Sequence, residues 1–313
     1  MAAIAVLYEN EAWLAPLFDA LEHEGASVER VYANALAFDP TSAAPAWSLA
    51  VNKVSPSSYL RGHGASIAFA RQYLAFLEGS GIPVVNGSDA FRLETSKALQ
   101  LLLLHQLGIA APRARVTNEP LRVVEAASAL RFPVIVKPNV GGSGALMKRF
   151  DSLEELRDGA AAVDFGPDGT VLVQEYLEPA DGSVVRVEFL AGRYLYAIRI
   201  TNDSADFNLC PADICQVPAP DQYGNLATAA KKPLRIEACE PPAGMIDAVL
   251  RIAKAGRLDV GGVEYLVAKR DGQPYVYDIN ALSNFVTDAP VLVGFDPHQR
   301  FARYLVARAK VAA

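Results

Sequence analysis

The first ninety residues alternate between short apolar runs and amphipathic stretches, and this alternation limits the folds open to the chain. Four apolar segments have the length of strands: residues 4–8, 28–32, 47–54 and 81–87. Between them, residues 11–23 and 66–77 carry apolar side chains at helical spacing. Strands that alternate with helices form parallel sheets covered by helices. We therefore predict an N-terminal α/β domain.

Beyond residue 90 the pattern changes to one long helix followed by pairs of strands. The helix is predicted at residues 93–107, with Gly108 as its C-terminal stop. Strands are predicted at residues 114–117, 133–137, 146–150, 171–177, 184–190, 194–201, 263–268 and 275–279, and helices at 121–130, 243–257 and 297–309. A chain of 313 residues exceeds what one hydrophobic core usually supports. We predict three units, residues 1–90, 91–170 and 171–313.

Composition and charge fit a soluble globular protein. The chain is 51% apolar and 20% charged, and its net charge of −6 argues against a nucleic-acid or anionic-membrane partner held by bulk charge. The densest apolar stretch, residues 98–104, is too short to span a membrane. Residues 1–9 lack the basic region of a signal peptide, and the cysteines number only three. We therefore expect a cytoplasmic protein.

Three oxygen-bearing side chains lie close together on the last predicted hairpin. Asp278 and Asn280 project from the same face of one strand because side chains alternate along a strand. Glu264 lies on the partner strand, and pairing across the turn at residues 270–273 brings it near them. Two carboxylates and an amide oxygen suit Mg²⁺, which takes one or two carboxylates together with phosphate oxygens. A solvated polar strand face is the alternative for this hairpin taken alone.

A glycine-rich segment follows the strand that ends at Lys137. Gly141, Gly142 and Gly144 free the backbone to direct N–H groups at an anion, and Ser143 adds a hydroxyl. Lys137 would supply positive charge for a phosphate. A strand follows this loop, whereas a helix follows the glycine loops of Walker and dinucleotide-binding motifs. An ordinary flexible loop is the alternative when the segment is considered by itself.

These motifs, in their order along the chain, resemble the ATP-grasp superfamily, in particular its glutathione synthetase and ribosomal-protein-modifying glutamate ligase branch. The similarity extends from Glu94 to Phe285. The matching segments are Ser96-Lys97-Ala98, Val136-Lys137-Pro138, Gly141-Gly142-Ser143-Gly144, Val173-Gln174-Glu175-Tyr176-Leu177, Gly262-Val263-Glu264 and Asp278-Ile279-Asn280.

The resemblance implies how these segments bind a nucleotide. Lys97 and Lys137 contact the phosphates of ATP, and the glycine-rich loop folds over them. The hinge formed by Glu175, Tyr176 and Leu177 meets the adenine through its backbone and its acidic residue. We therefore expect ATP and Mg²⁺ as cofactors, bound between two lobes.

The resemblance also implies the metal ligands and two catalytic arginines. Asp278, Asn280 and Glu264 would hold Mg²⁺. Relatives usually have Asp on the first metal strand and Glu on the second, so the order is exchanged here, and the alternative is that Glu264 is only a neighbour of the metal. Arg186 and Arg199 lie where the family places basic residues facing phosphate and acyl substrate.

The fold and activity implied are those of an ATP-grasp ligase, with an N-terminal parallel α/β domain followed by two α+β lobes that clasp ATP. Such an enzyme joins a carboxylate to an amine through an acyl phosphate and releases ADP and phosphate. One alternative is a cyclising ligase, whose nucleophile belongs to the same substrate. Another is a non-catalytic ATP-binding protein. The substrates are expected to be a small-molecule carboxylate and amine, and homodimers are common among similar enzymes.

The acceptor side of the site is the part that the sequence defines least. The family's usual Pro-Gly after the Asn motif is replaced by residues 281–285, and the polar segment 202–232 is expected to line the acyl or acceptor site. Lys53 and Ser57 follow a predicted strand and either face the cleft or lie in a surface loop. The surface loop is favoured, so neither is predicted as a site residue.

Overall fold

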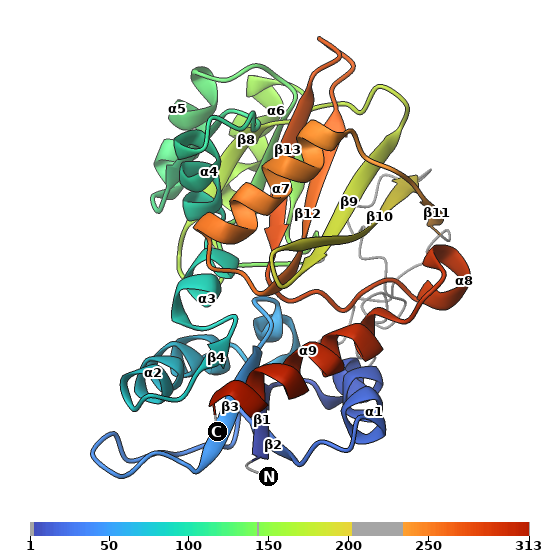
Figure 1. Cartoon of the computed structure of the whole chain (residues 1–313). Coiled ribbons are helices and arrows are strands. Elements are labelled where there is room, and N and C mark those ends of the chain that lie inside the picture. The colour runs from blue at the N-terminus through green and yellow to red at the C-terminus, as the bar shows by residue number, and fades with distance from the viewer. Residues whose placement is uncertain (1–2, 143, 202–233, 313) are drawn as a thin grey trace.

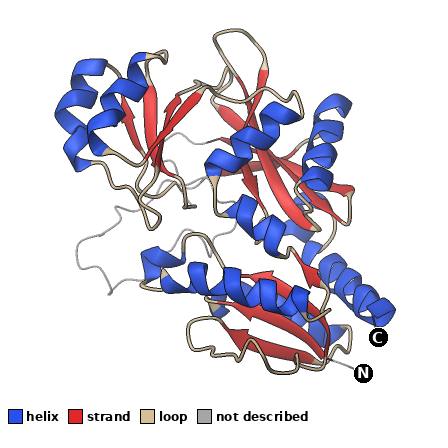
Figure 2. Ribbon diagram, turned by 90° about the vertical axis from the view of Figure 1, so that its left-hand side faces the viewer, coloured by secondary structure: helices blue, strands red, loops and turns tan. Residues whose placement is uncertain are grey.

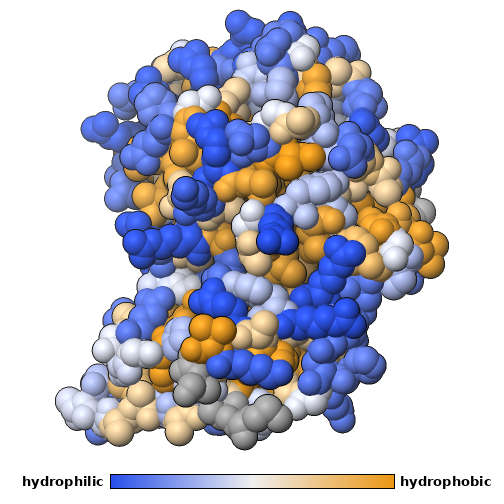
Figure 3. Space-filling model, viewed as in Figure 1, coloured by the Kyte–Doolittle hydropathy of each residue, from blue (hydrophilic) through white to orange (hydrophobic). Residues whose placement is uncertain are grey.

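A computed structural model describes residues 3–142, 144–201 and 234–312, which form three β-sheets with helices packed against them (Figure 1). Ser143 and the polar segment 202–232 lie outside the described residues. None of the helices in the described ranges is both long and apolar enough to cross a membrane. Hydrophilic side chains form most of the outer margin in the view of Figure 3, with apolar side chains interspersed.

The N-terminal sheet is parallel, as predicted from the alternation of strands and helices, with the order β2-β1-β3-β4. Its strands are β1 (Ala3–Tyr8), β2 (Val28–Tyr32), β3 (Trp47–Lys53) and β4 (Val84–Val85). Its helices are η1 (Glu11–Leu14), α1 (Ala15–His23), η2 (Ser58–Arg61) and α2 (Ala65–Gly79). The carboxyl end of β3 points toward the rest of the molecule and carries Lys53 there (Figure 1).

The central sheet is antiparallel, with the order β5-β8-β6-β7. Its strands are β5 (Ala114–Thr117), β6 (Val134–Pro138), β7 (Lys148–Phe150) and β8 (Val171–Glu175). The helical segments η3 (Pro120–Arg122), α5 (Val123–Ser128), α6 (Leu153–Gly159) and η4 (Ala160–Ala162) belong to this unit, on the outer side of its sheet (Figure 2). Val134, Val136, Val171 and Val173 pack toward them. The alternate residues of β6 and β8 therefore face inward.

The C-terminal sheet has the order β11-β10-β9-β12-β13, so β13 is an edge strand. Its strands are β9 (Ser183–Leu190), β10 (Arg193–Thr201), β11 (Arg235–Ala238), β12 (Val260–Val267) and β13 (Pro274–Asn280), and its helices include α7 (Ala243–Ala255) and α8 (Ala289–Val293). The predicted hairpin of β12 and β13 is confirmed, with Glu264 opposite Asp278.

The single helix predicted at residues 93–107 is wrong, because the segment forms two helices. α3 (Ser88–Glu94) ends before Thr95, and α4 (Lys97–Gln106) begins after Ser96. Ser96 is extended, and its hydroxyl accepts a hydrogen bond from the N–H of Leu99 at 3.3 Å. A serine in this position is a strong helix N-cap. The break places Lys97 in the first turn of α4, which packs against β13.

Two segments of the chain pack against a unit other than the one predicted to contain them. The predicted division at residues 90 and 170 therefore stays a prediction. α3 and α4 contribute Ala90, Leu93 and Leu104 to the core behind the C-terminal sheet. The last helix, α9 (Pro297–Ala312), packs on α1 and β3 of the N-terminal unit (Figure 1). Its Phe301 and Leu305 are buried in a core that both units share.

Candidate active site

A cavity of about 650 Å³ lies between the inner faces of the central and C-terminal sheets and the N-terminal unit. Twelve of the fourteen residues predicted from the sequence line it: Lys97, Lys137, Gly141, Gly142, Gly144, Glu175, Tyr176, Leu177, Arg186, Glu264, Asp278 and Asn280. Ser143 is outside the described residues, and Arg199 is not part of the cavity wall.

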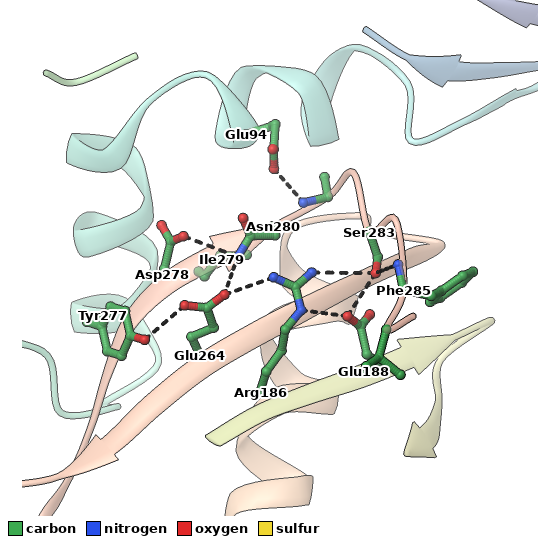
Figure 4. Close-up of polar contacts among 12 residues, drawn as sticks. Glu94, Arg186, Glu188, Glu264, Tyr277, Asp278, Ile279, Asn280, Ser283 and Phe285 are labelled. Atoms are coloured by element: carbon green, nitrogen blue, oxygen red, sulfur yellow. Dashed lines mark hydrogen bonds and ion pairs between the residues drawn. The ribbon is translucent and has the colours of Figure 1, made fainter. Parts of the chain in front are cut away.

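The three predicted metal ligands lie together at the end of the β12–β13 hairpin (Figure 4). The side-chain nitrogen of Asn280 lies 3.1 Å from Asp278 Oδ2 and 3.5 Å from Glu264 Oε1. The antiparallel register accounts for this, because Glu264 pairs with Asp278 and the side chains of Asp278 and Asn280 share a face.

Glu264 is also held by two neighbours that the metal assignment did not include. Arg186 Nη1 donates to one of its carboxylate oxygens at 2.8 Å, and the hydroxyl of Tyr277 donates to the other at 2.9 Å. Burial raises the pKa of Glu264, and the guanidinium of Arg186 opposes that rise. A Cβ atom on Gly262 would lie 2.7 Å from Arg186 Nε, so glycine at this position makes room for the guanidinium.

The kind of oxygen atoms that Asp278, Glu264 and Asn280 carry determines which metal ion they fit. Among the described residues, no group of three or more His, Cys, Asp and Glu side chains is arranged to hold a metal ion. Two carboxylates and an amide oxygen fall short of the six oxygens that Mg²⁺ prefers, and phosphate oxygens or water usually complete its shell. Asp278, Glu264 and Asn280 therefore fit Mg²⁺ that arrives with a phosphate ligand.

Lys97 forms a partly buried ion pair with Asp278 across the interface between α4 and β13. Burial by itself would lower the pKa of Lys97, but the Asp278 carboxylate raises it above its ordinary value. Burial would likewise raise the pKa of Asp278, but Lys97 and then Lys137 hold it below the ordinary value. Both groups are therefore charged at neutral pH.

Lys137 differs from Lys97 because its ammonium group has no partner among the residues that the structure describes. It is 4% exposed, and no hydrogen bond or ion pair joins it to any residue in the described part of the chain. Burial, and then the charge of Lys97, lowers the pKa of Lys137 to about 7. A buried ammonium without a counter-charge is costly unless a ligand supplies one.

The glycine-rich loop closes this end of the cavity against the N-terminal unit. A Cβ atom on Gly141 would lie 3.3 Å from the Tyr59 hydroxyl oxygen, and one on Gly142 would lie 3.7 Å from Ser57 Cβ. Gly144 adopts a φ of +66°, which residues with a side chain rarely do. The loop therefore lies beside Lys137 and contacts the residues that follow β3.

Part of the wall of this cavity is apolar and forms a slot between the central sheet and β12. Ile135, Met147, Leu177 and Leu266 line it. Among the described residues, the N–H of Leu177 donates to no other group. An apolar slot with a free backbone donor at its edge suits a planar heterocycle.

Glu175 borders the cavity, but its carboxylate is bound to basic groups. Its Oε2 accepts from Arg270 Nη1 at 2.9 Å. Its Oε1 accepts from the N–H of Arg131 at 3.2 Å and lies 3.6 Å from Arg113 Nη1. The adenine contact predicted for this acidic side chain stays a prediction, and these bonds do not favour it.

Gln174 faces the cavity instead, and the sequence did not single out its side chain. It pairs with Ile135, and Lys137 lies on the same inner face of the sheet two residues further along β6. Gln174 is 3% exposed, and within the described ranges its side-chain oxygen has no hydrogen-bond partner. The alternation of side chains along β8 predicts this, but only once the inner face of the sheet is known.

Comparisons with known proteins agree with this arrangement. No family model matches the chain. The D-alanine–D-alanine ligase of Pseudomonas fluorescens (strain Pf0-1) is 36% identical over 102 residues, which are 32% of this chain and 31% of that protein. A probable alpha-L-glutamate ligase of Pasteurella multocida (strain Pm70) is 24% identical over 211 residues, 66% of this chain and 59% of that protein. Each match spans less than two thirds of the relative's length.

A solved structure matches nearly the whole chain. The ATP-grasp ligase PsnB, complexed with a minimal precursor, has a TM-score of 0.68 at 20% identity, over 98% of this chain and 100% of that one. The chain has the ATP-grasp fold. The fold class predicted from the sequence is therefore confirmed, although the similarity at this level of identity concerns the fold alone.

Within the ATP-grasp fold, Arg199 does not join the other predicted residues. It pairs with Val185 in the sheet, so its side chain lies on the opposite face from that of the neighbouring Arg186. Its guanidinium contacts Asp181 Oδ2 at 2.6 Å and Ser183 Oγ at 3.0 Å. The catalytic role predicted for Arg199 stays a prediction that this placement does not support.

The surface loop favoured for Lys53 and Ser57 is wrong, because both are buried in the cavity wall. Lys53 Nζ donates to the carbonyl oxygen of Ser283 at 2.8 Å. The hydroxyls of Ser55 and Ser57 lie 2.8 Å apart and are also buried. The sequence placed these residues at a strand end, but only the ATP-grasp fold brings that end against the segment after Asn280.

Glu94 is a further buried acid that the sequence did not single out. It lines the cavity, and its Oε2 accepts a hydrogen bond from the N–H of Ala281, the residue after Asn280. Burial raises the pKa of Glu94 to about 7. No local sequence signal marks it, because Glu94 ends α3 whereas Lys97 begins α4, and only the packing of these helices against β13 brings both side chains to the cavity.

Proposed function

We propose that this protein is an ATP-dependent ligase that joins a carboxylate to an amine. The observation that carries the proposal is the buried ammonium of Lys137, which has no partner in the described part of the chain and faces the same cavity as Asp278 and Glu264. A chain of phosphate groups with bound Mg²⁺ would complement both kinds of group. The phosphate oxygens would pair with the ammonium, and the carboxylates would coordinate the metal. ADP and Mg are present together in a solved complex of the similar protein PsnB.

The side chains of the site would position the phosphates of ATP and neutralise their charge. These two tasks are most of what a protein contributes to phosphoryl transfer. Mg²⁺ held by Asp278, Asn280 and Glu264 would neutralise phosphate charge. Lys137 pairs with phosphate from the central sheet, and Lys97 does so from α4. The glycine-rich loop covers the phosphates and keeps water from the reacting groups.

The reaction that we propose passes through an acyl phosphate. The substrate carboxylate attacks the γ-phosphorus of ATP, the bond to the β-phosphate oxygen breaks, and ADP leaves. The amine then attacks the acyl carbon, loses a proton and displaces inorganic phosphate. Arg186, which is buried beside Glu264 in the cavity wall, would stabilise negative charge on the acyl oxygen.

The adenine is proposed to lie in the apolar slot between Ile135, Leu177 and Leu266. The N–H of Leu177, which has no acceptor in the described part of the chain, would donate to a ring nitrogen. The amide of Gln174 carries both a donor and an acceptor, and this pattern complements the 6-amino group and N7 of adenine. Gln174 thus takes over the base contact that the sequence assigned to Glu175.

The carboxylate and amine substrates are proposed to enter between the N-terminal unit and the residues after β13. Lys53, Ser55, Ser57 and Glu9 line that part of the cavity. The similar proteins include a ligase of D-alanine and a ligase solved with a precursor peptide, so the acceptor is to be sought among both amino acids and peptides.

An assay of ADP release tests the proposal. The protein would be incubated with ATP, Mg²⁺ and a panel of amino acids and short peptides, singly and in pairs, and products identified by mass spectrometry. Turnover that needs both an acid and an amine, with a product heavier than either, supports the ligase. A product one water lighter than a single substrate points to the cyclising alternative. ATP binding without stimulated turnover across the panel contradicts the proposal.

A further inference from the structure

Among the described strands, the metal strand β13 has one edge without a neighbour. It is the last strand of its sheet, and β12 is the one described strand that pairs with it. Every second residue of such a strand directs its N–H and C=O outward, and buried backbone groups of this kind need partners. The outward residues at its end are Ile279, between Asp278 and Asn280, and then Ala281.

Side chains, and not a strand, satisfy these outward groups. Gln100 on α4 donates from Nε2 to the carbonyl oxygen of Ile279 at 2.8 Å and accepts from the N–H of Ile279 at 3.3 Å. The same Nε2 lies 3.2 Å from the carbonyl oxygen of Leu93, the residue before the end of α3. Gln100 is 3% exposed. Its amide therefore occupies the place that a partner strand's peptide group would fill.

The next outward residue, Ala281, is held on both sides. Its N–H donates to Glu94 Oε2, and its carbonyl accepts from the side-chain nitrogen of Asn86. Glu94 and Asn86 are both buried. The backbone on either side of Asn280 is thus fixed by groups outside its own sheet.

These contacts follow a regular pattern along one segment of chain. Glu94, Lys97 and Gln100 are three residues apart, and they contact Ala281, Asp278 and Ile279 in turn. We propose that Gln100 and Glu94 are positioning residues that set the metal strand against the helix carrying Lys97. Because Ile279 lies between Asp278 and Asn280, any shift of its peptide group displaces both oxygen ligands. This inference rests on the proposed binding of Mg²⁺ with a nucleotide.

The experiment compares Gln100→Met with Gln106→Met, a matched change at an exposed glutamine on the same helix. Methionine keeps the unbranched shape and helix preference of glutamine but removes its amide. Binding of ADP would be measured by calorimetry with and without Mg²⁺, and amide hydrogen exchange would be followed in peptides that cover residues 276–282.

In the wild type and in Gln106→Met, Mg²⁺ should tighten ADP binding to the same degree. In Gln100→Met that gain should shrink by about tenfold, as expected for a residue that orients metal ligands, while ADP affinity without Mg²⁺ stays unchanged. Exchange at Ile279 should become faster in Gln100→Met alone. An undiminished Mg²⁺ effect, or unchanged exchange at Ile279, overturns the inference.

A second pair of variants separates positioning from folding. Glu94→Gln keeps an oxygen that can accept from the N–H of Ala281, so the Mg²⁺ effect should survive, whereas Glu94→Leu should lose it. Equal loss in both variants contradicts a positioning role for Glu94. If Mg²⁺ does not affect ADP binding in the wild type, the proposed function fails, and faster exchange at Ile279 in Gln100→Met still supports the role of Gln100 in holding the strand.

Discussion

The two sheets that face each other across the cavity treat their buried polar groups differently. On the C-terminal sheet the charges are already paired, Lys97 with Asp278 and Arg186 with Glu264 and Glu188, although the second carboxylate oxygen of Glu188 has no hydrogen-bond partner among the described residues. On the central sheet, Lys137 has no counter-charge among the described residues, and the side-chain oxygen of Gln174 has no hydrogen-bond partner there.

The wall of the cavity formed by the C-terminal sheet is thus organised before a ligand binds. The wall formed by the central sheet carries polar groups whose partners a ligand would supply. Paired charges hold one another in place and need little rearrangement when the metal and phosphates arrive. Unpaired buried groups destabilise the free protein, and a ligand that supplies their partners removes that penalty on binding. The central sheet is therefore where binding energy for the nucleotide should concentrate.

The largest effect is expected at the organised wall, from Asp278→Ala. This change removes a metal ligand and the partner of Lys97, so the rate of ADP release should fall roughly 1,000-fold or more while the fold is kept. Circular dichroism would check the fold. Asp247→Ala, at an exposed position on α7, is the control and should be fully active. Near-normal turnover in Asp278→Ala would overturn the metal assignment.

The two lysines of the cavity wall give the sharpest test of the comparison, because the same substitution should act in opposite directions. Lys97→Met leaves the partly buried carboxylate of Asp278 without its cation, so the free energy of unfolding should fall by about 2 kcal/mol. Lys137→Met removes an unpaired charge, so it should rise, on the order of 2 kcal/mol at pH 7. Denaturant unfolding measures both. Equal destabilisation by the two variants would show that the walls do not differ.

A smaller effect is expected from Gln174→Leu. Loss of the amide should weaken ADP binding roughly tenfold and reduce the preference for ADP over GDP, because a 6-oxo base offers no donor to the amide oxygen. Glu175→Gln is the matched control and should leave the base preference unchanged, since that carboxylate is bound to Arg270 and Arg131. Calorimetry with both nucleotides decides between them, and a base preference that changes only in Glu175→Gln would reverse the assignment.

The smallest expected effect is a proton taken up when ADP binds. Burial and Lys97 lower the pKa of Lys137 to about 7 in the free protein, whereas an unfolded lysine titrates near pH ~10.4. A bound phosphate favours the charged form, so ADP affinity should fall as the pH rises above about 7. Over the same window Lys137 makes the free protein more stable as pH rises, because the unfolded chain binds more protons there.

Calorimetry at pH 8 in two buffers with different ionisation enthalpies measures this proton uptake. Uptake of up to one proton is expected in the wild type. Lys137→Met should abolish it, and Lys137→Arg, whose guanidinium stays charged, should abolish it too. Proton uptake that persists in Lys137→Met would assign the titrating group elsewhere.

Much of the fold could be predicted because it depends on local patterns. The parallel N-terminal sheet, the hairpin of β12 and β13 and the strand before the glycine-rich loop follow from side-chain periodicity and turn residues. The break between α3 and α4 was missed, although Ser96 is a good N-cap, because the apolar spacing continues on both sides of it. α6 was missed as well, although Ser152 caps it and acidic residues fill its first turn.

Local motifs were enough to identify which residues could meet phosphate and metal, since Lys137, the glycine-rich loop, Asp278 and Asn280 each lie in one. How those residues are paired depends on the packing of distant elements. The tertiary structure joined Lys97 to Asp278, turned Arg199 to the other face of its sheet and buried Lys53 against Ser283. The physical reason is that periodicity fixes which side chains share a face of one element, whereas the partner of a buried charge depends on which elements, distant in sequence, pack against that face.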